Sequence, residues 1–222
     1  MKYMPNRRKD LNITGANLWY LVGLITSDGC LSKDGRHIDI TSKDKEFLAG
    51  LKTKLGFINK IGIKNKDMKN QAYHIQVANR SFYEFLVSVG LTPNKSLSLK
   101  GLNIIEEFFA DFFRGLVDGD GCIRSWIHPS NNREQWSLRI YSGSKEFIDW
   151  LNNIAEQLLQ VRGKIHKNAN NTWVLKYGKM AAKEIIKQCY YENCLGLDRK
   201  IKLAQGCRAS GVGWTQSKTV LN

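Results

Sequence analysis

Hydrophobic residues recur along the chain with two spacings, one typical of helices and the other of strands. Residues 16–27 form an almost continuous apolar run, which predicts a buried helix. In residues 37–41, Ile38 and Ile40 alternate with polar side chains, and this two-residue period predicts a strand with one buried face. Residues 44–55 carry apolar side chains three and four positions apart, as expected for an amphipathic helix.

Two more strands and a helix complete this first unit. Alternate apolar residues in the two strands are expected to face the core, namely Ile61, Ile63, Tyr73, Ile75 and Val77. A last helix is expected over residues 80–89. The predicted order of elements is therefore α-β-β-α-β-β-α.

The second half of the chain repeats this pattern. Gly-Leu-Ile at 23–25 is matched by Gly-Leu-Val at 115–117, and the segment SKDKEFLAGL (42–51) is matched by SGSKEFIDWL (142–151). The change in offset between these two matches places a longer loop at 127–135 in the second copy. The corresponding helices of the second copy are expected over 105–119, 144–159 and 179–190.

The duplication predicts an α+β fold in which two αββαββα units are related by a pseudo-two-fold axis. Each unit should contain an antiparallel four-stranded sheet, with one apolar face against helices and one polar face in solvent. The predicted boundaries are 1–98 for the first repeat, 99–105 for a linker, 106–209 for the second repeat and 210–222 for a C-terminal tail.

The net charge indicates a polyanionic partner. The 222 residues include 34 Lys and Arg against 20 Asp and Glu, giving a formal net charge of +14, and such an excess is typical of nucleic-acid-binding proteins. The 5 cysteines lack paired CxxC spacing, which favours reduced thiols and an intracellular location. No secretory signal and no apolar run of about 18 residues is present, so membrane association is not expected.

The polar faces of the two predicted sheets are candidates for contact with nucleic acid. Long side chains at alternate strand positions can reach base edges in the major groove, and the charge excess favours this interpretation over an ordinary solvated face. The candidates are Arg36, His37, Asp39, Lys60, Lys64, His74 and Gln76 in the first repeat and Arg124, Arg139, Arg162, Lys164, His166 and Lys176 in the second.

The two apolar helices both end in an aspartate followed by glycine, at Asp28 and Asp120. Each helix has small residues four positions apart, Gly23 and Ser27 in the first and Gly115 and Gly119 in the second. Close packing of the helices through these residues would bring the two aspartates together. Two carboxylates at helix C-termini oppose the helix dipoles and repel each other, and a shared divalent cation would offset both effects. An isolated Asp-Gly is often only a turn, but the matched pair argues against that interpretation.

The segments LVGLITSDG (21–29) and FRGLVDGDG (113–121) resemble the paired motifs of the LAGLIDADG homing endonucleases, in their single-chain, two-repeat form. The resemblance covers roughly residues 14–205. It implies a saddle-shaped fold in which the motif helices form the central interface and the sheets straddle double-stranded DNA. It also implies that Asp28 and Asp120 bind the catalytic metals.

The resemblance carries further expectations about chemistry. Two or three Mg²⁺ ions would serve double-strand cleavage of a long, specific DNA site with short 3′ overhangs, by a monomer. Mn²⁺ should substitute for Mg²⁺, and Ca²⁺ should support binding without cleavage. The backbone carbonyls of Ser27 and Gly119 are expected to assist as metal ligands, and the catalytic lysines suggested by the resemblance are Lys43, Lys95 and Lys200, with Arg199 the alternative to Lys200.

Two charged residues of the second motif, Asp118 and Arg114, are expected to act outside the metal site or at its border. Asp118 corresponds to Thr26 of the first motif and is expected to cap or pair locally, outside the metal site. Arg114 is open to two interpretations, a DNA-facing charge or a charge at the helix interface.

Two other functions remain open on the same scaffold. The first is an intron RNA maturase, because basic sheets cannot distinguish DNA from RNA. The second is a non-catalytic DNA-binding regulator, which would normally carry an added helix-turn-helix segment. The composition is compatible with an organelle (mitochondrion or chloroplast) or a microbial cytoplasm, and such enzymes are typically intron-encoded.

Overall fold

The computed structural model describes residues 13–65 and 71–209. Residues 1–12 of the predicted first repeat and the predicted tail at 210–222 lie outside the described residues. The first repeat contains α1 (Gly15–Asp28), β1 (Gly29–Leu31), β2 (His37–Ser42), α2 (Lys45–Leu55), β3 (Ile61–Asn65), β4 (Ala72–Ala78) and α3 (Arg80–Val89). The second contains the 3-10 helix η1 (Glu106–Phe108), α4 (Phe109–Asp120), β5 (Gly121–Ile127), β6 (Glu134–Ser142), α5 (Lys145–Leu159), β7 (Lys164–Lys167), β8 (Trp173–Tyr177), α6 (Lys179–Cys189) and α7 (Asp198–Ala209).

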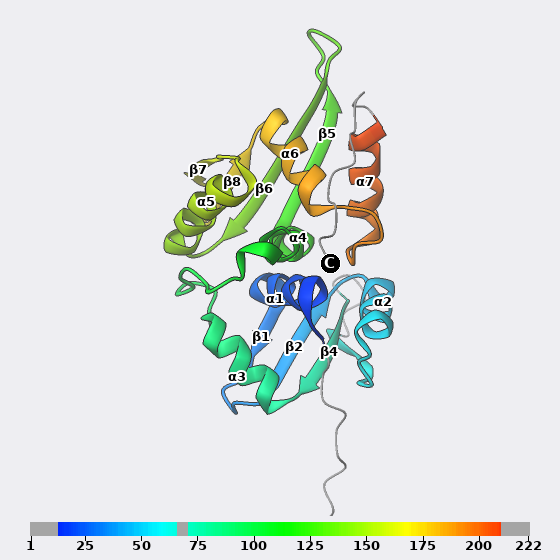
Figure 1. The fold of residues 1–222 in the computed structure, drawn as a ribbon, viewed down its shortest axis with the longest axis vertical. Helices are drawn as coiled ribbons and strands as arrows, with labels where there is room; N and C mark the ends of the chain where they lie inside the picture. The colour runs from blue at the N-terminus through cyan, green and yellow to red at the C-terminus, as the bar shows by residue number, and fades with distance from the viewer. Residues whose placement is uncertain (1–12, 66–70, 210–222) are drawn as a thin grey trace, which may run out of the picture.

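The two repeats build two antiparallel four-stranded sheets with the same topology. The strand orders are β1-β2-β4-β3 and β5-β6-β8-β7. Helices α1 and α4 lie side by side at the centre, with the first repeat on one side of them and the second on the other (Figure 1). The predicted duplicated α+β fold is confirmed.

Local sequence signals explain where several helices begin and end. The side chains of Asp44, Asn79 and Ser144 accept hydrogen bonds from backbone N–H groups in the first turns of α2, α3 and α5, as N-cap residues do. Helix α2 ends at Gly56, whose φ of 70° lies in the left-handed region that glycine adopts without strain. These caps therefore fix where the helices begin and end.

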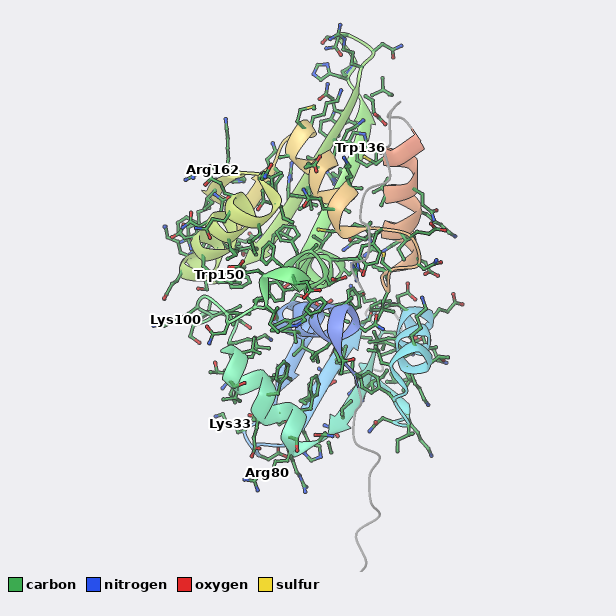
Figure 2. The ribbon with its side chains drawn as sticks, in the orientation of Figure 1. Lys33, Arg80, Lys100, Trp136, Trp150 and Arg162 are labelled. Atoms are coloured by element: carbon green, nitrogen blue, oxygen red, sulfur yellow. The ribbon has the colours of Figure 1, made fainter. Side chains whose placement is uncertain are left out.

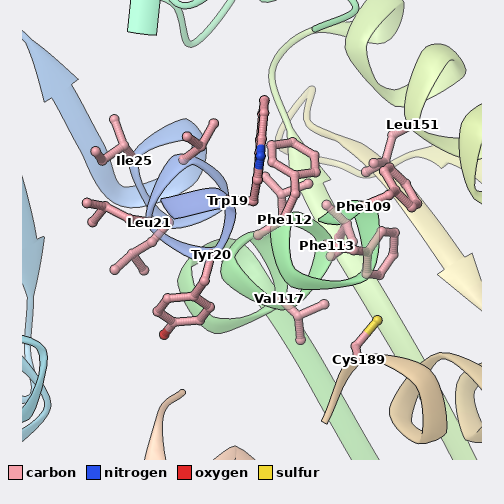
Figure 3. Packing of buried hydrophobic residues seen from close by; sticks show 14 of the residues in the cluster. Trp19, Tyr20, Leu21, Ile25, Phe109, Phe112, Phe113, Val117, Leu151 and Cys189 are labelled. Atoms are coloured by element: carbon pink, nitrogen blue, oxygen red, sulfur yellow. The ribbon is translucent and has the colours of Figure 1, made fainter. Parts of the chain in front are cut away.

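The hydrophobic core is continuous through the central helices. Leu21 and Ile25 of α1 point toward the first sheet (Figure 3). Phe113 of α4 lies against Tyr177 of β8 on the second side, with ring centroids 6.1 Å apart. Because each central helix is buried against its own sheet and against the other helix, the position of the helix ends is fixed by packing on two sides.

Two features differ from the sequence-based expectation. Ile63, expected in the core, is 51% exposed, because β3 is an edge strand whose pairing with β4 shifts between Ile63 and Asn65. Helix α7 is an addition that the hydrophobic pattern did not predict; it packs against α6, and its residues Ala204 and Cys207 are buried in the core. None of the helices in the described part of the chain is long and apolar enough to span a membrane.

Candidate active site at the helix junction

Two glycines allow α1 and α4 to touch backbone to backbone. A Cβ atom placed on Gly23 would lie 2.0 Å from the carbonyl oxygen of Phe112, and one on Gly115 would lie 2.1 Å from that of Tyr20. Real Cβ atoms do not approach backbone atoms so closely. The contact therefore requires glycine at both positions, and it sets the separation of the two helices.

The same contact brings together the C-terminal ends of the helices. A Cβ atom on Gly119 would lie 1.9 Å from the Ser27 hydroxyl oxygen and 3.4 Å from the carboxyl carbon of Asp28. Asp28 is the last residue of α1, and Asp120 is the last residue of α4. The two aspartates thus meet across the junction, with the carbonyl ends of both helices beside them.

The pKa values of both carboxyl groups are raised. Although the two side chains are exposed at the protein surface, the surrounding protein desolvates the carboxyl group of Asp28, and this together with the charge of Asp120 raises its pKa to about 6. Desolvation likewise raises the pKa of Asp120. The arrangement is electrostatically unfavourable for the protein alone and is suited to a divalent cation, whose charge would favour both ionised forms.

The donor set fits a cation that keeps part of its coordination sphere open. No cluster of three or more His, Cys, Asp and Glu side chains suited to a metal occurs within residues 13–65 and 71–209. Asp28 and Asp120 would therefore be the side-chain ligands, with the carbonyl oxygens of Ser27 and Gly119 nearby and the remaining positions left for water or phosphate oxygen. Hard oxygen ligands of this kind are those that Mg²⁺ prefers.

The raised pKa of Asp28 predicts a pH-dependent loss of stability in the metal-free protein. Because the folded state binds this proton more tightly than the unfolded chain, the contribution to stability is present below about pH 4 and is lost as the pH rises through about 6. In EDTA at pH 7.5, Asp28→Asn should therefore raise the free energy of unfolding by about 1 kcal/mol, allowing for solvent screening. Thermal unfolding of both proteins at pH 4 and pH 7.5 measures this, and equal midpoints at pH 7.5 would contradict it.

Two buried lysines, Lys95 and Lys200, lie beside the ends of the motif helices. Lys95 donates to the carbonyl oxygen of Gly29, directly after α1. Lys200 donates to the carbonyl oxygens of Val117, Asp118 and Gly121, the last two at 3.0 and 2.9 Å. Each lysine thus binds the carbonyl groups at the end of its own repeat's motif helix, and Lys200, rather than Arg199, occupies this place in the second repeat. A cation at a helix C-terminus is favourable with respect to the helix dipole.

These lysines also share the electrostatic environment of the aspartates. Desolvation lowers the pKa of Lys200 to about 8, and the nearby carboxylates of Asp118 and Asp28 oppose that shift. Desolvation also lowers the pKa of Lys95, opposed by Cys30, Asp120 and Asp28. A lysine with its pKa near neutrality can change protonation state during a reaction more readily than a solvated one.

Lys43 occupies a different position from the two buried lysines. It is exposed and lines an open cavity together with Asp28, Gly119 and Arg199. A second cavity on the other side of the junction is lined by Asp120 and Lys95, and there the residue corresponding to Lys43 is Gly143. The two sides of the site are therefore chemically unequal.

Asp118 has a role that its sequence position did not reveal. Its carboxylate accepts hydrogen bonds from the hydroxyls of Tyr190 (2.7 Å) and Tyr20 (2.9 Å) and from the backbone N–H of Leu197 (2.8 Å). The expectation of a local partner is wrong, since all three donors are distant in sequence. The buried carboxylate ties α4 to α1 and to the start of α7, the helix that carries Lys200.

Arg114 lies in the interior, so a DNA-facing role is excluded. It is 0% exposed, and its Nη2 lies 2.8 Å from a carboxylate oxygen of Asp111. The guanidinium also donates to the carbonyl oxygens of Leu195 and Cys189, both at 2.7 Å, and lies over the ring of Tyr191. It therefore fastens α4 to the segment between α6 and α7. Asp111, three positions earlier on the same helix, is a partner that local spacing can indicate, whereas Leu195, Cys189 and Tyr191 are distant in sequence.

The outer face of the first sheet carries most of the predicted nucleic-acid contacts of that repeat. Asp39 pairs in register with Gln76, and Thr41 pairs with His74, so these four residues share one face. Lys64 Nζ lies 3.4 Å from Asp39 and 2.8 Å from the Thr41 hydroxyl on that face. The ring Nδ1 of His37, at the start of β2, contacts the carboxylate of Asp34. Lys60 is exposed just before β3.

The outer face of the second sheet is more basic. Arg139, Lys176 and Lys164 lie side by side across β6, β8 and β7 and form what is called here the basic row. His166 is exposed on the same face of β7, two residues beyond Lys164. Arg139 pairs with Cys122 of β5 as Asp39 pairs with Cys30 of β1, so the two residues occupy equivalent positions in their sheets. The two sheets therefore present different charges to a ligand.

Two predicted contacts lie away from these faces. Arg36 lies in the turn before β2 and lines a cavity with Tyr83 and Glu84 of α3, on the helix-covered side. Arg162 forms an ion pair with Glu156 of α5 at the edge of the second sheet (Figure 2). In both cases the alternation rule fails because the residue lies in a connection outside the regular strand.

The fold and the site define a pseudo-symmetric, two-repeat protein that places one carboxylate from each repeat at a central helix junction. The LAGLIDADG-like domain model matches the chain twice, over residues 16–90 and 107–190. The chain therefore belongs to the LAGLIDADG family.

Solved structures of low sequence identity share the fold. The meganuclease I-SmaMI bound to uncleaveable DNA has a TM-score of 0.58 and 16% identity, over 88% of this chain and 90% of that chain. I-DmoI in complex with DNA and Ca has a TM-score of 0.56 and 18% identity, over 86% and 97%. Full-length WhiA from Thermatoga maritima has a TM-score of 0.55 and 15% identity, over 91% of this chain and 65% of WhiA.

One curated relative is similar in sequence. The DNA-directed RNA polymerase subunit Rpo1C of Methanocaldococcus jannaschii is 25% identical over 136 residues, or 59% of this chain. The match spans 14% of the length of that subunit. The similarity therefore concerns one part of a much longer protein.

Proposed function

We propose that this protein is a site-specific DNA endonuclease that makes a double-strand break by divalent-metal-dependent hydrolysis, leaving short 3′ overhangs. The observation that carries the proposal is the meeting of Asp28 and Asp120 at the ends of two helices in backbone contact. The two carboxyl groups raise the free energy of the metal-free protein, and within residues 13–65 and 71–209 neither side chain forms a hydrogen bond or an ion pair that would give it a structural role. A catalytic role for the pair explains this cost.

The residues of the site have distinct tasks in this proposal. Asp28 and Asp120 hold two or three Mg²⁺ ions, assisted by the carbonyl groups of Ser27 and Gly119. When bound, the ions neutralise phosphate charge and lower the pKa of bound water. Lys95 and Lys200 fix the carbonyl ends of the motif helices and place positive charge beside the phosphate. Lys43 extends from one side of the site only, as an exposed charge near Asp28.

Double-stranded DNA is the proposed partner of the two outer sheet faces. The chain has a net charge of +14, and the basic row provides cations that can contact phosphates and base edges. The structurally similar I-SmaMI and I-DmoI were solved with DNA. With one carboxylate from each repeat, a monomer can address both strands without a second subunit.

The proposal is tested with a library of randomised long DNA duplexes. We expect one class of sequence to be cut on both strands in Mg²⁺ or Mn²⁺, and to be bound but not cut in Ca²⁺. Binding should weaken steeply as salt rises, because phosphate contacts release counterions. Specific binding with no cleavage in any of the three metals would contradict the nuclease assignment. Tight, specific binding of intron RNA in place of DNA would favour the maturase alternative.

A further inference from the structure

The β5–β6 hairpin is longer than its counterpart in the first repeat. Strands β5 and β6 pair at seven positions, from Gly121 with Ile140 to Ile127 with Glu134, whereas β1 and β2 pair at three. Both hairpins begin directly after a motif helix and lead away from the helix junction. The β5–β6 hairpin projects to one end of the molecule, beyond the helices of its repeat (Figure 1).

The part of β5 that has no counterpart in the first repeat, residues 124–127, includes Arg124 and Trp126 on the outer face of the sheet. Strand alternation places both on the side of Cys122, which pairs with Arg139 of the basic row. Both side chains are exposed, and Trp126 keeps 44% of its surface accessible. Ile127, which is 57% exposed, projects from the opposite face of the same strand. The outer face is thus continuous from the basic row to the end of β5.

These two side chains suit the outer part of a DNA site. An arginine can bind phosphate or the edge of guanine, and an apolar ring can contact a thymine methyl group. In the part of the first repeat that the structure describes (13–65 and 71–98), no strand lies at the matching distance from its carboxylate, because β1 ends at Leu31 and the chain turns back over residues 32–36. A feature present in one repeat alone makes the proposed interface asymmetric.

We infer that the second repeat reads a longer half-site than the first, with Arg124 and Trp126 contacting its outermost base pairs. Four added residues, at about 3.4 Å each, extend the hairpin by about 14 Å, which is the rise of about four base pairs of B-DNA. Measured from the point of cleavage, the target should extend about four base pairs further on the side bound by the second repeat. The inference rests on the proposed binding of DNA.

The test uses the duplex recovered from the randomised library and shortens it one base pair at a time from each end. In Ca²⁺, binding should weaken with fewer base pairs removed from one end than from the other. Arg124→Ala and Trp126→Ala should each weaken binding of the full duplex by roughly 5- to 150-fold, the cost of one lost specific contact. Neither variant should weaken binding of the duplex already shortened at its longer side. Ile127→Ala, on the opposite face, should bind as the parent protein does.

The outcomes separate this inference from the proposed function. Two half-sites of equal length, or equal losses by Trp126→Ala on full and shortened duplexes, would overturn the inference while cleavage in Mg²⁺ continues. An unequal site that is bound but never cut would support the inference and contradict the nuclease assignment. If no duplex is bound at all, both are wrong.

Discussion

Asp28→Asn and Asp120→Asn are each expected to abolish double-strand cleavage while leaving DNA binding in place. Each substitution keeps the size of the side chain and removes the charge that would hold a divalent cation. Loss of groups that only orient metal ligands already costs about 10- to 100-fold in metal affinity or activity, so loss of a ligand should reduce cleavage by at least about 100-fold. Because the outer sheet faces are unchanged, affinity for the target in Ca²⁺ should fall much less than the rate of cleavage in Mg²⁺.

The measurement is a single-turnover cleavage assay that follows each strand separately, beside a binding titration of the same duplex. Glu84→Gln provides a matched control, since Glu84 lies on α3 in an exposed ion pair with Arg80. This control should cut at the parent rate. Full activity in Asp28→Asn or Asp120→Asn would place the metal elsewhere. Equal loss of binding and cleavage would indicate that the substitution had disturbed the fold.

Much of the fold could be predicted because hydrophobic periodicity and duplication act together. The apolar run at 16–27 predicted α1, and the alternation of Ile38 and Ile40 predicted β2. The second repeat supported the same element order independently. The glycine spacing indicated a close helix contact, which the structure shows at Gly23 and Gly115. Because these signals are local or periodic, they can be recognised in the amino-acid sequence alone.

The supporting network could not be predicted because its partners are distant in sequence. Asp118 is held by Tyr20 and by the segment around Leu197, and the pairs are separated by 98 and 79 positions. A DNA-facing role for Arg114 was open in the sequence because nothing in a basic protein marks one arginine as buried. The structure shows that Arg114 is fully buried. Helix α7 was missed because its pattern of apolar residues is weak. Such contacts depend on tertiary packing that the local pattern does not encode.

The network also affects the candidate site directly. Lys200 lies in the first turn of α7 and reaches the end of α4. The backbone N–H of Leu197, the residue directly before α7, donates to Asp118 of α4. In the first repeat, Thr26 replaces Asp118 and its hydroxyl donates to the carbonyl oxygen of Val22, within the same helix. Lys95 and Lys200 therefore bind corresponding carbonyl oxygens, those of Gly29 and Gly121. In the second repeat a buried carboxylate, that of Asp118, also binds the chain beside the lysine, whereas the first repeat has Thr26 at that position.

Gly23→Ala and Gly115→Ala are expected to be strongly destabilising, although alanine is the better helix former. In each variant the new Cβ would lie about 2 Å from a backbone carbonyl oxygen of the other helix, and no side-chain rotation can relieve that clash. The helices must separate, at a cost of about 3 kcal/mol, the upper part of the range for overpacking. Thermal unfolding should show midpoints lowered by roughly 6–12 °C.

Gly50→Ala is the control for this substitution. Gly50 lies within α2, and a Cβ there would meet nothing within 4 Å, so alanine should stabilise the protein by up to about 1 kcal/mol. Since the interface glycines set the spacing of Asp28 and Asp120, Gly23→Ala should also slow cleavage at temperatures where it remains folded. A displacement of about 1 Å can cost about 100-fold in rate. Unchanged stability in Gly23→Ala would show that the helices do not meet at these glycines, and the basis for bringing the carboxylates together would be lost.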